Sequence, residues 1–399
     1  MRTSNLRARE DFDAILASTL SDHWTRTTGE TVEARPDDGG DGQLWQDHSL
    51  LTGVFCADAS PAVIRYMRDE LRYTPVVHRA PAQWILGSLV ASRPALKTLT
   101  RPILRVSPSV KGGEHVLILT GHRRLRLLDF AGGHSLTLVK SGYDRRCITR
   151  EIAIRNGAGP FVAIETSDPE GRWLREPLIQ GRSLPRIPGA ARRNRVLTDT
   201  IARLDQWQRE MERRVSSAAH LSSLTEKIRE HLVTLEDKHG ADSITGVTSW
   251  LEPLEQRVLA RDALPVATTH GDLQAGNILV DPQKDLGFVV DLEYARPRFR
   301  LYDLLCWGLQ ARPAIDGLDH RLARFVRRGD LRDVTDLIPE TQDPAWRQWA
   351  SALFVLEELE RLGEEATSGP CHDPGPPWRH FVETLKSLRA HEPTLFEGP

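Results

Sequence analysis

Residues 268–303 read TTHGDLQAGNILVDPQKDLGFVVDLEYARPRFRLYD, and this stretch decides the predicted fold. Two short apolar runs, 278–280 and 288–290, predict strands, and the DPQKD segment between them favours a turn. A hairpin of this kind brings Asn277, at the start of one strand, close to Asp291, at the end of the other. An amide oxygen and a carboxylate delivered side by side suit a hard cation such as Mg²⁺.

Asp272 lies on the loop that enters this hairpin. Phosphoryl transfer to a hydroxyl needs a carboxylate that orients the nucleophile and accepts its proton. A turn aspartate that caps the local backbone would look the same in isolation. The neighbouring Asn277 and Asp291 favour the catalytic interpretation, and Glu293 is expected to add a second or water-mediated metal contact. The stretch therefore predicts a base at Asp272 beside a metal site.

Two further polar residues in the stretch are interpreted as structural. His270, just before the loop, is expected to hold the backbone by hydrogen bonds. Asp303 opens a predicted helix and either braces the loop by accepting backbone or Arg hydrogen bonds or serves as a plain N-cap.

Length and composition describe an ordinary soluble protein. The 399 residues are 40% hydrophobic and 27% charged, with a formal net charge of −2. This balance gives no reason to expect nucleic acid or an anionic membrane as a partner. The start, MRTSNLRARED, is charged where a signal peptide would be apolar, and no run of 18 apolar residues occurs. We expect a cytoplasmic protein without a membrane span.

The four cysteines are interpreted as small core hydrophobes of a reducing compartment, because they are widely separated and lack metal-ligand spacing. They are Cys56, Cys147, Cys306 and Cys371.

Three regions succeed one another along the chain. Residues 1–100 form a region of unknown role, either a small accessory domain or an N-terminal elaboration of the second region. Residues 101–185, the second region, predict a small sheet with one helix, because apolar runs alternate with turn segments. Residues 186–399 are mainly helical by their three- and four-residue apolar spacing. The predicted fold is therefore α+β and bilobal.

Lys140 and Glu151 form a second candidate site in residues 101–185. Lys140 ends a predicted strand, where an ammonium can neutralise nucleotide phosphates if an acidic partner holds it. Glu151 lies in the next predicted helix and is expected to be that partner. The alternative is a surface lysine and an unrelated glutamate. The rarity of lysine, seven among 53 basic residues, favours the functional interpretation.

The turn between the first two strands of this region, TGHRR at 120–124, is where a phosphate-covering loop would lie. It offers a single glycine, Gly121, with Arg123 among its cationic neighbours. These arginines either grip phosphate or face solvent. No G-x-x-x-x-G-K-[ST] motif occurs, which excludes a Walker-type nucleotide site.

The motif HGDLQAGNIL at 270–279, with VDLEYA at 290–295 and RLYD at 300–303, resembles the aminoglycoside phosphotransferase and choline kinase family. That resemblance implies a protein kinase-like fold, with a small antiparallel-sheet N-lobe, a mainly helical C-lobe and, in this chain, an additional N-terminal region. The similarity is specific over 265–305, moderate over 115–185 and absent before residue 100.

The resemblance also implies roles for individual residues. Asp272 would be the catalytic base, and Asn277 and Asp291 would be Mg²⁺ ligands. Lys140 and Glu151 would be the phosphate-binding lysine and its ion-pair partner. The segment from Glu176 to Leu178 would be the hinge against which adenine lies. The sparse glycine turn departs from the family pattern.

Together these features predict an ATP-dependent, Mg²⁺-requiring kinase that acts on a hydroxyl of a small molecule. Candidate acceptors are a sugar, an aminoglycoside, an amino alcohol or an envelope saccharide, and no protein partner is evident. The acidic run from Glu357 to Glu365 either attracts a cationic acceptor or is a solvated helix face. The alternative function is a pseudokinase-like nucleotide-binding or regulatory module without turnover.

Overall fold

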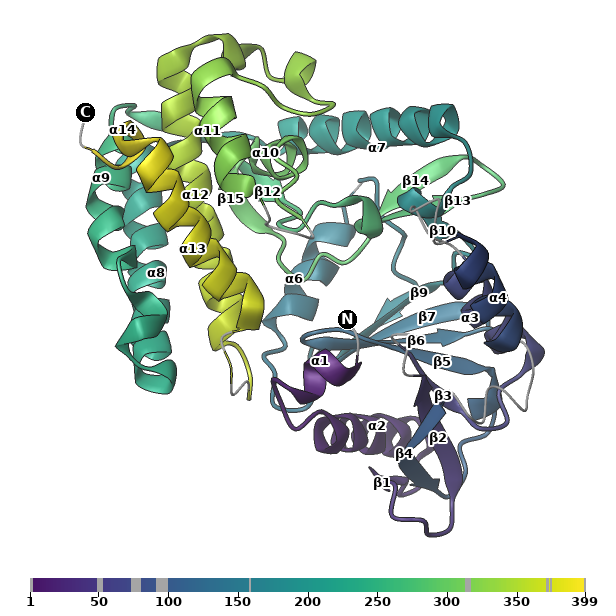
Figure 1. Ribbon diagram of the computed structural model, residues 1–399. Helices are drawn as coiled ribbons and strands as arrows, with labels where there is room; N and C mark the ends of the chain where they lie inside the picture. The colour runs from purple at the N-terminus through teal and green to yellow at the C-terminus, as the bar shows by residue number, and fades with distance from the viewer. Residues whose placement is uncertain are drawn as a thin grey trace. The chain divides into compact units, whose positions relative to one another are not determined.

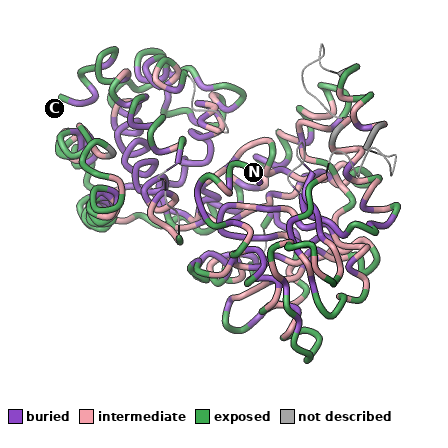
Figure 2. The backbone as a smooth tube through the Cα atoms, turned by 60° about the horizontal axis from the view of Figure 1, so that its bottom comes forward, coloured by how far each residue is buried: buried purple, intermediate pink, exposed green. Residues whose placement is uncertain are grey.

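A computed structural model describes the greater part of the chain. Its described residues are 3–48, 53–72, 80–90, 100–157, 159–312, 317–370, 373 and 375–397. They form two compact units (Figure 1). The first comprises Met1–Gly157, Phe161–Leu197 and Leu279–Phe288, and the second comprises Ala158–Pro160, Thr198–Ile278 and Val289–Pro399. Figure 2 shows buried residues in both units, so each has a core of its own.

The first unit is built on an antiparallel sheet in the order β1-β4-β2-β3-β5-β6-β7-β9-β8. The strands are β1 (Glu33–Pro36), β2 (Gln43–His48), β3 (Gly53–Cys56), β4 (Thr100–Ser107), β5 (Val116–Thr120), β6 (Arg124–Asp129), β7 (His134–Val139), β8 (Thr166–Ser167) and β9 (Trp173–Pro177). β5, β6, β7 and β9 match the strands predicted at residues 115–120, 124–130, 135–140 and 173–176. Alternation of apolar and polar residues, with glycine at the turns, accounts for that agreement.

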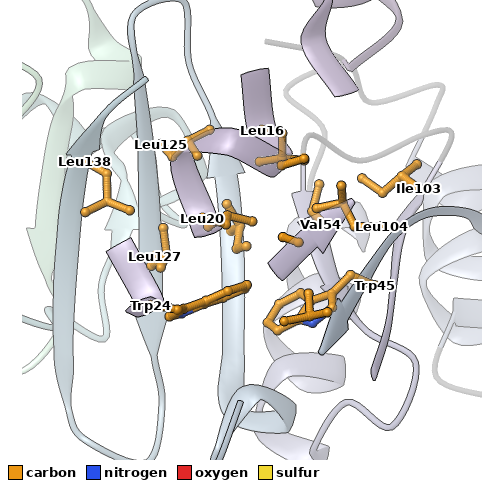
Figure 3. Packing of buried hydrophobic residues seen from close by; sticks show 14 of the residues in the cluster. Leu16, Leu20, Trp24, Trp45, Val54, Ile103, Leu104, Leu125, Leu127 and Leu138 are labelled. Carbon is orange, nitrogen blue, oxygen red and sulfur yellow. The ribbon is translucent and has the colours of Figure 1, made fainter. Parts of the chain in front are cut away.

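Helices cover both faces of this sheet. They are α1 (Thr3–Arg7), α2 (Phe12–Thr28), α3 (Pro61–Arg72), α4 (Ala80–Val90) and α6 (Arg146–Arg155). The start of α7 (Ala190–Glu210) also belongs to the first unit. α2 buries Leu16, Leu20 and Trp24 against one face, which includes Leu138 of β7 (Figure 3). On the other face, α6 packs Cys147 and Ile148 against Leu174 and the partly buried Val139.

The described part of residues 1–100 belongs to this same sheet. β4 pairs with both β1 and β2, and β3 pairs with β5, so the N-terminal strands continue the sheet without a break. Of the two predicted alternatives, an elaboration of the neighbouring region therefore fits these contacts. Pro102 lies near the start of β4, and the β2–β4 register shifts beside it, an irregularity by which a sheet can accommodate proline.

The second unit is mainly helical. Its helices are the remainder of α7, α8 (Ser217–His239), α9 (Val247–Leu259), α10 (Tyr302–Gly308), α11 (Leu318–Arg328), α12 (Pro344–Thr367), α13 (Gly375–His391) and α14 (Pro393–Phe396). α12 is buried along most of its length, from Trp346 to Gly363, and packs against α8, α9 and α11. A helix that is covered on nearly all sides is the centre of its unit.

Two three-stranded sheets complete the list of strands. One has the order β10-β13-β14 and contains the predicted hairpin; its strands are β10 (Arg182–Ser183), β13 (Ile278–Asp281) and β14 (Leu286–Val289). The other has the order β11-β12-β15, with β11 (Arg213–Ser216), β12 (Ala263–Thr269) and β15 (Arg296–Phe299). This second sheet was not predicted. Proline disfavours a strand in general, but β15 is an edge strand and can carry Pro297.

The predicted fold class is confirmed: an antiparallel sheet dominates the first unit and helices dominate the second. Cys56, Cys147 and Cys306 are buried free thiols, and Cys371 lies outside the described residues. No helix within the described ranges is long and apolar enough to cross a bilayer.

Candidate functional site

The loop from His270 to Asp272 follows β12 in the second unit and is held by Asp303. The backbone N–H groups of His270 and Gly271 donate to the two carboxylate oxygens of Asp303 at 2.6 and 2.9 Å. Gln208 donates to Asp303 at 2.7 Å, and the Asp303 side chain is fully buried. Asp303 therefore binds the loop backbone at two successive residues.

Both ring nitrogens of His270 are engaged. Nδ1 lies 3.1 Å from the backbone nitrogen of Asp272 and accepts its N–H, and Nε2 donates to the carbonyl of Val290 at 2.9 Å. A histidine used in this way positions backbone rather than transferring protons. Gly271 has φ +84°, and a Cβ there would lie 2.5 Å from the carbonyl of Tyr294, so only glycine fits.

Asp272 is partly exposed, with a side-chain exposure of 18%, and neighbouring groups fix its carboxylate. One oxygen accepts from Arg312 Nε at 2.8 Å. The other accepts from Gln274 and from the side-chain nitrogen of Asn277, both at 3.0 Å. That nitrogen also donates to the carbonyl of Asp272 at 2.9 Å. Because the side-chain nitrogen of Asn277 is committed to Asp272, the side-chain oxygen Oδ1 is the atom that Asn277 could offer to a cation.

Asn277 and Asp291 come together as the hairpin predicted. The backbone N–H of Val290 donates to the main-chain carbonyl of Asn277 at 2.9 Å, which brings the two strand ends side by side. Asp291 has φ +74°, a left-handed conformation that non-glycine residues adopt mostly at constrained sites. Asp291 and Glu293 are partly exposed on either side of buried Leu292.

The chemistry of this group suits Mg²⁺. Among the described residues, no three or more His, Cys, Asp and Glu side chains are arranged to hold a metal. The predicted set is of another kind, an amide oxygen of Asn277 with the carboxylates of Asp291 and Glu293. Mg²⁺ is commonly bound by one or two carboxylates together with substrate phosphates and water, so a full protein cage is not required.

The predicted pair of Lys140 and Glu151 is not formed. Lys140 is completely buried, and its ammonium group makes an ion pair with Glu10, which Tyr143 also contacts. The same ammonium donates to the carbonyls of His122 at 2.7 Å and Gly121 at 3.3 Å. Three acceptors use all three of its N–H groups, so Lys140 fastens the turn to the N-terminal segment.

Lys140 and Glu151 do not pair because they lie on opposite faces of the sheet. Leu138 of β7 faces α2, and Lys140, two residues later, follows it to that side of the sheet. Val139 faces α6, which carries Glu151. Arg124 of β6 is the direct cross-strand partner of Val139 and therefore lies on the α6 face. The strand residue whose cation reaches Glu151 is therefore Arg124.

Glu151 lies in a buried network of opposite charges. One of its oxygens accepts from Arg124, and the other accepts from Arg155 at 2.7 Å. Arg155 also pairs with Glu176, which lies 3.9 Å from Arg126. Burial alone would raise the pKa of Glu151, but Arg124 and Arg155 outweigh it and lower that pKa. Glu151 is consequently an anion that holds two guanidinium groups in place.

The remaining predicted positions lie around the same sheet. The N–H of Gly121 donates to the carbonyl of Arg124 at 2.9 Å and closes the turn between β5 and β6. Arg123 is buried, which excludes the solvent-facing alternative for this side chain. Leu178 follows β9, packs against the cluster that contains Leu128, and donates its N–H to Gly133 at 2.9 Å.

The first three glutamates of the acidic run lie on α12 and are neither exposed to solvent nor open to a cationic ligand. Glu357, Glu358 and Glu360 are all buried. Glu357 accepts from the backbone of Phe299 at 2.8 Å, and Glu360 pairs with Arg296. Both interpretations made from the sequence are wrong for these three residues, because internal cations and backbone donors satisfy them.

Arg312, which contacts both Asp272 and Glu358, was not predicted as a site residue. It follows α10 in a segment without a recognised motif, and nothing in its sequence context marks it. Only the fold brings it beside a residue forty positions earlier.

Residues 166–337 match the model of a family described as the phosphotransferase enzyme family. No curated protein matches the chain. Among solved structures, a choline/ethanolamine kinase family protein from Mesorhizobium loti is 17% identical, with 70% of this chain and 87% of that chain covered and a TM-score of 0.41. Choline kinase LicA from Streptococcus pneumoniae is 14% identical, with 69% and 90% covered and a TM-score of 0.38.

An aminoglycoside-3'-phosphotransferase of type VIII is 17% identical, with 69% of this chain and 94% of that chain covered and a TM-score of 0.35. The family match includes the whole of the Asp272 loop and the hairpin. It confirms the resemblance and the enzyme class predicted from the catalytic-loop motif: over residues 166–337, this chain is similar to phosphotransferase enzymes.

Proposed function

We propose that this protein transfers the γ-phosphoryl group of ATP to a hydroxyl group of a small molecule. The observation that carries the proposal is the Asp272 loop, in which Asp303 fixes the backbone and Asn277 binds the Asp272 side chain and main chain. The family match over residues 166–337 supports the same reaction class.

Each residue of this loop then has a role. Asp272 accepts the proton of the acceptor hydroxyl as the new oxygen–phosphorus bond forms and ADP leaves. Asn277 and Asp291 would hold Mg²⁺, and Glu293 would bind it directly or through water. When bound, Mg²⁺ neutralises charge that develops on the phosphates. His270 and Asp303 keep the loop in place.

The first unit would bind the nucleotide. Since Lys140 is committed to Glu10, we assign the cation on the phosphate side to Arg124, which Glu151 holds. A guanidinium binds phosphate oxygens at least as well as an ammonium does. The turn at Gly121 and Arg123 would cover the phosphates, and the segment at Glu176 and Leu178 would lie against the base.

The acceptor is proposed only as a class: a sugar, an aminoglycoside, an amino alcohol or an envelope saccharide. One observation favours the alternative, a nucleotide-binding regulatory module without turnover. Lys140, the lysine predicted to contact phosphate, is buried and has other partners. Turnover distinguishes the two functions. A kinase in which Arg124 takes the place of that lysine would turn over, and a module without a phosphate-binding cation would not.

The test is release of ADP from ATP in the presence of Mg²⁺ and a library of hydroxylated metabolites. Asp272→Ala should keep its ATP affinity and lose about 10²- to 10⁴-fold in turnover, because a general base contributes that much. Asp291→Ala should bind ATP equally well with Mg²⁺ and with chelator, whereas the wild type should need Mg²⁺.

Asp281→Ala is the matched control, since Asp281 lies in the same hairpin and its side chain accepts only the turn N–H of Gln283. This variant should behave as the wild type. ATP binding without turnover on any acceptor would favour the regulatory module. Undiminished turnover of Asp272→Ala would remove Asp272 from the mechanism.

A further inference from the structure

Arg312 joins the proposed base to the central helix of the second unit. Its Nε donates to Asp272 at 2.8 Å, and a terminal nitrogen donates to Glu358 at 2.7 Å and lies 3.3 Å from the Tyr302 hydroxyl. The other terminal nitrogen donates to the carbonyl of Ala311 at 3.0 Å. The side chain is 7% exposed, so the guanidinium group is removed from water and bonded at every nitrogen.

Glu358 is a second ionic partner of Arg312, besides Asp272. It is buried on α12, and it accepts from Arg312, from Tyr302 and from Arg361 at 3.4 Å. Burial alone would raise the pKa of Glu358, but Arg312 and Arg361 lower it to about 2. An anion is therefore always present behind Arg312. The guanidinium group therefore has an ionic partner besides Asp272.

The Asp272 carboxylate is consequently held at both oxygens. Arg312 binds one oxygen from the side of α12, and Gln274 and Asn277 bind the other from within the loop. Rotation of the carboxylate about its Cβ–Cγ bond would break at least one of these contacts. Charge-assisted hydrogen bonds are the stronger kind, so Arg312 should supply the firmest of the three anchors.

We propose that Arg312 is a positioning residue that orients Asp272 toward the acceptor hydroxyl, with Glu358 as its fixed support. The inference rests on the proposed function and assigns a role to a residue outside every recognised motif. A planar guanidinium can bridge two carboxylates at once, which the single ammonium of lysine does less well. Misplacement of a reacting group by about 1 Å can cost on the order of 10²-fold in rate.

The test compares Arg312→Gln, Arg312→Lys and a control, Arg347→Gln. Arg347 is equally buried in the same unit, but it donates to the backbone carbonyls of Val326, Thr341, Gln342 and Arg327 and does not contact Asp272. Arg312→Gln should lower kcat about 10- to 100-fold, with KM for ATP changed less than about twofold. Arg312→Lys should recover part of that loss. The folded fraction of Arg347→Gln should keep the wild-type kcat.

Three outcomes would overturn the inference. A kcat of Arg312→Gln at or above the wild-type value would mean that Arg312 is dispensable or masks the base. An equal loss of kcat in Arg347→Gln would mean a general effect of a disturbed core. A parallel rise in KM for ATP would place Arg312 in nucleotide binding. If Arg312→Gln does not fold, the split between kcat and KM is read from Arg312→Lys.

The failure of the proposed function is recognised separately. It would show as a wild-type protein that releases no ADP with any acceptor, and the role of Arg312 would fall with it. Wild-type turnover with unchanged kinetics in both Arg312 variants would reject the positioning role alone.

Discussion

At the scale of single residues, the chain uses charge in ways that residue type does not reveal. Lys140 looks like a phosphate ligand by its place at a strand end, yet it is a buried structural cation between Glu10 and the turn carbonyls. Arg124, sixteen positions earlier, occupies the place beside Glu151. Successive side chains of a strand point to opposite faces of the sheet. A shift of one position therefore decides whether a cation lies on the face of α2, as Lys140 does, or on the face of α6 and Glu151, as Arg124 does.

Lys140→Met should destabilise the protein without a specific effect on nucleotide binding. It leaves Glu10 buried without its cation, and breaking a buried pair costs about 3–5 kcal/mol. The measurement is the free energy of unfolding in denaturant. Lys386→Met is the control, because the pair of Lys386 with Glu383 is exposed and contributes about 0–1 kcal/mol. Weakened ATP binding at unchanged stability would return Lys140 to the phosphate site.

At the scale of elements, α12 organises the second unit. It is buried from Trp346 to Gly363 and still carries three glutamates inside the core. Two of them are satisfied from β15, Glu357 by the backbone of Phe299 and Glu360 by Arg296. Glu358 is satisfied by Arg312, which lies beyond α10. α12 therefore links the Asp272 loop and β15 through charges that only the packed unit brings together.

The stability of the second unit should fall in acid because of Glu358. Its pKa is about 2 in the folded protein against an ordinary value of 4.5. The stabilisation is fully present above pH 4.5 and is lost as the pH falls toward 2, a difference of about 3 kcal/mol. The measurement is the unfolding free energy of the wild type minus that of Glu358→Gln, from about pH 6 down to about pH 3. A difference that does not shrink with acidification would contradict this origin.

At the scale of the whole molecule, the chain builds two units with separate cores, and its N-terminal part is integral to the first. α2 covers one face of the nine-stranded sheet and contributes Leu16, Leu20 and Trp24 to the apolar cluster on that face (Figure 3). Within the segment that carried no motif, α2 therefore packs on the sheet as part of its core. Glu10, just before α2, also supplies the partner of Lys140.

Leu20→Ala should therefore destabilise the first unit although it lies far from every proposed site residue in the sequence. Leu20 is fully buried, and leucine-to-alanine changes in a core cost about 2–5 kcal/mol. Leu259→Ala, at a leucine that is 42% exposed, should cost less than about 1 kcal/mol. The measurement is the denaturant midpoint of each variant. Equal costs would mean that α2 does not stabilise the sheet.

Much of the fold was predictable where pattern and turn chemistry agree. The strands β5, β6, β7 and β9 and the hairpin of β13 and β14 follow from alternation and from Gly, Asp and Pro at their turns. β15 was not predictable because proline disfavours a strand in general, and only its edge position makes Pro297 acceptable. β1, β2 and β3 are short. β2 and β3 pair with each other, but each of the three also pairs with a strand distant in sequence, β4 for β1 and β2 and β5 for β3.

By itself, the sequence determined the hairpin within residues 268–303, because a short turn between two apolar runs brings the ends of the two strands, at Asn277 and Val290, together through local geometry. The tertiary structure decided which charged groups meet across long separations. Glu10 with Lys140, Arg124 with Glu151, and Asp272 with Arg312 each depend on which face of a sheet or side of a helix is covered. Packing of distant elements sets that choice, and no local pattern encodes it.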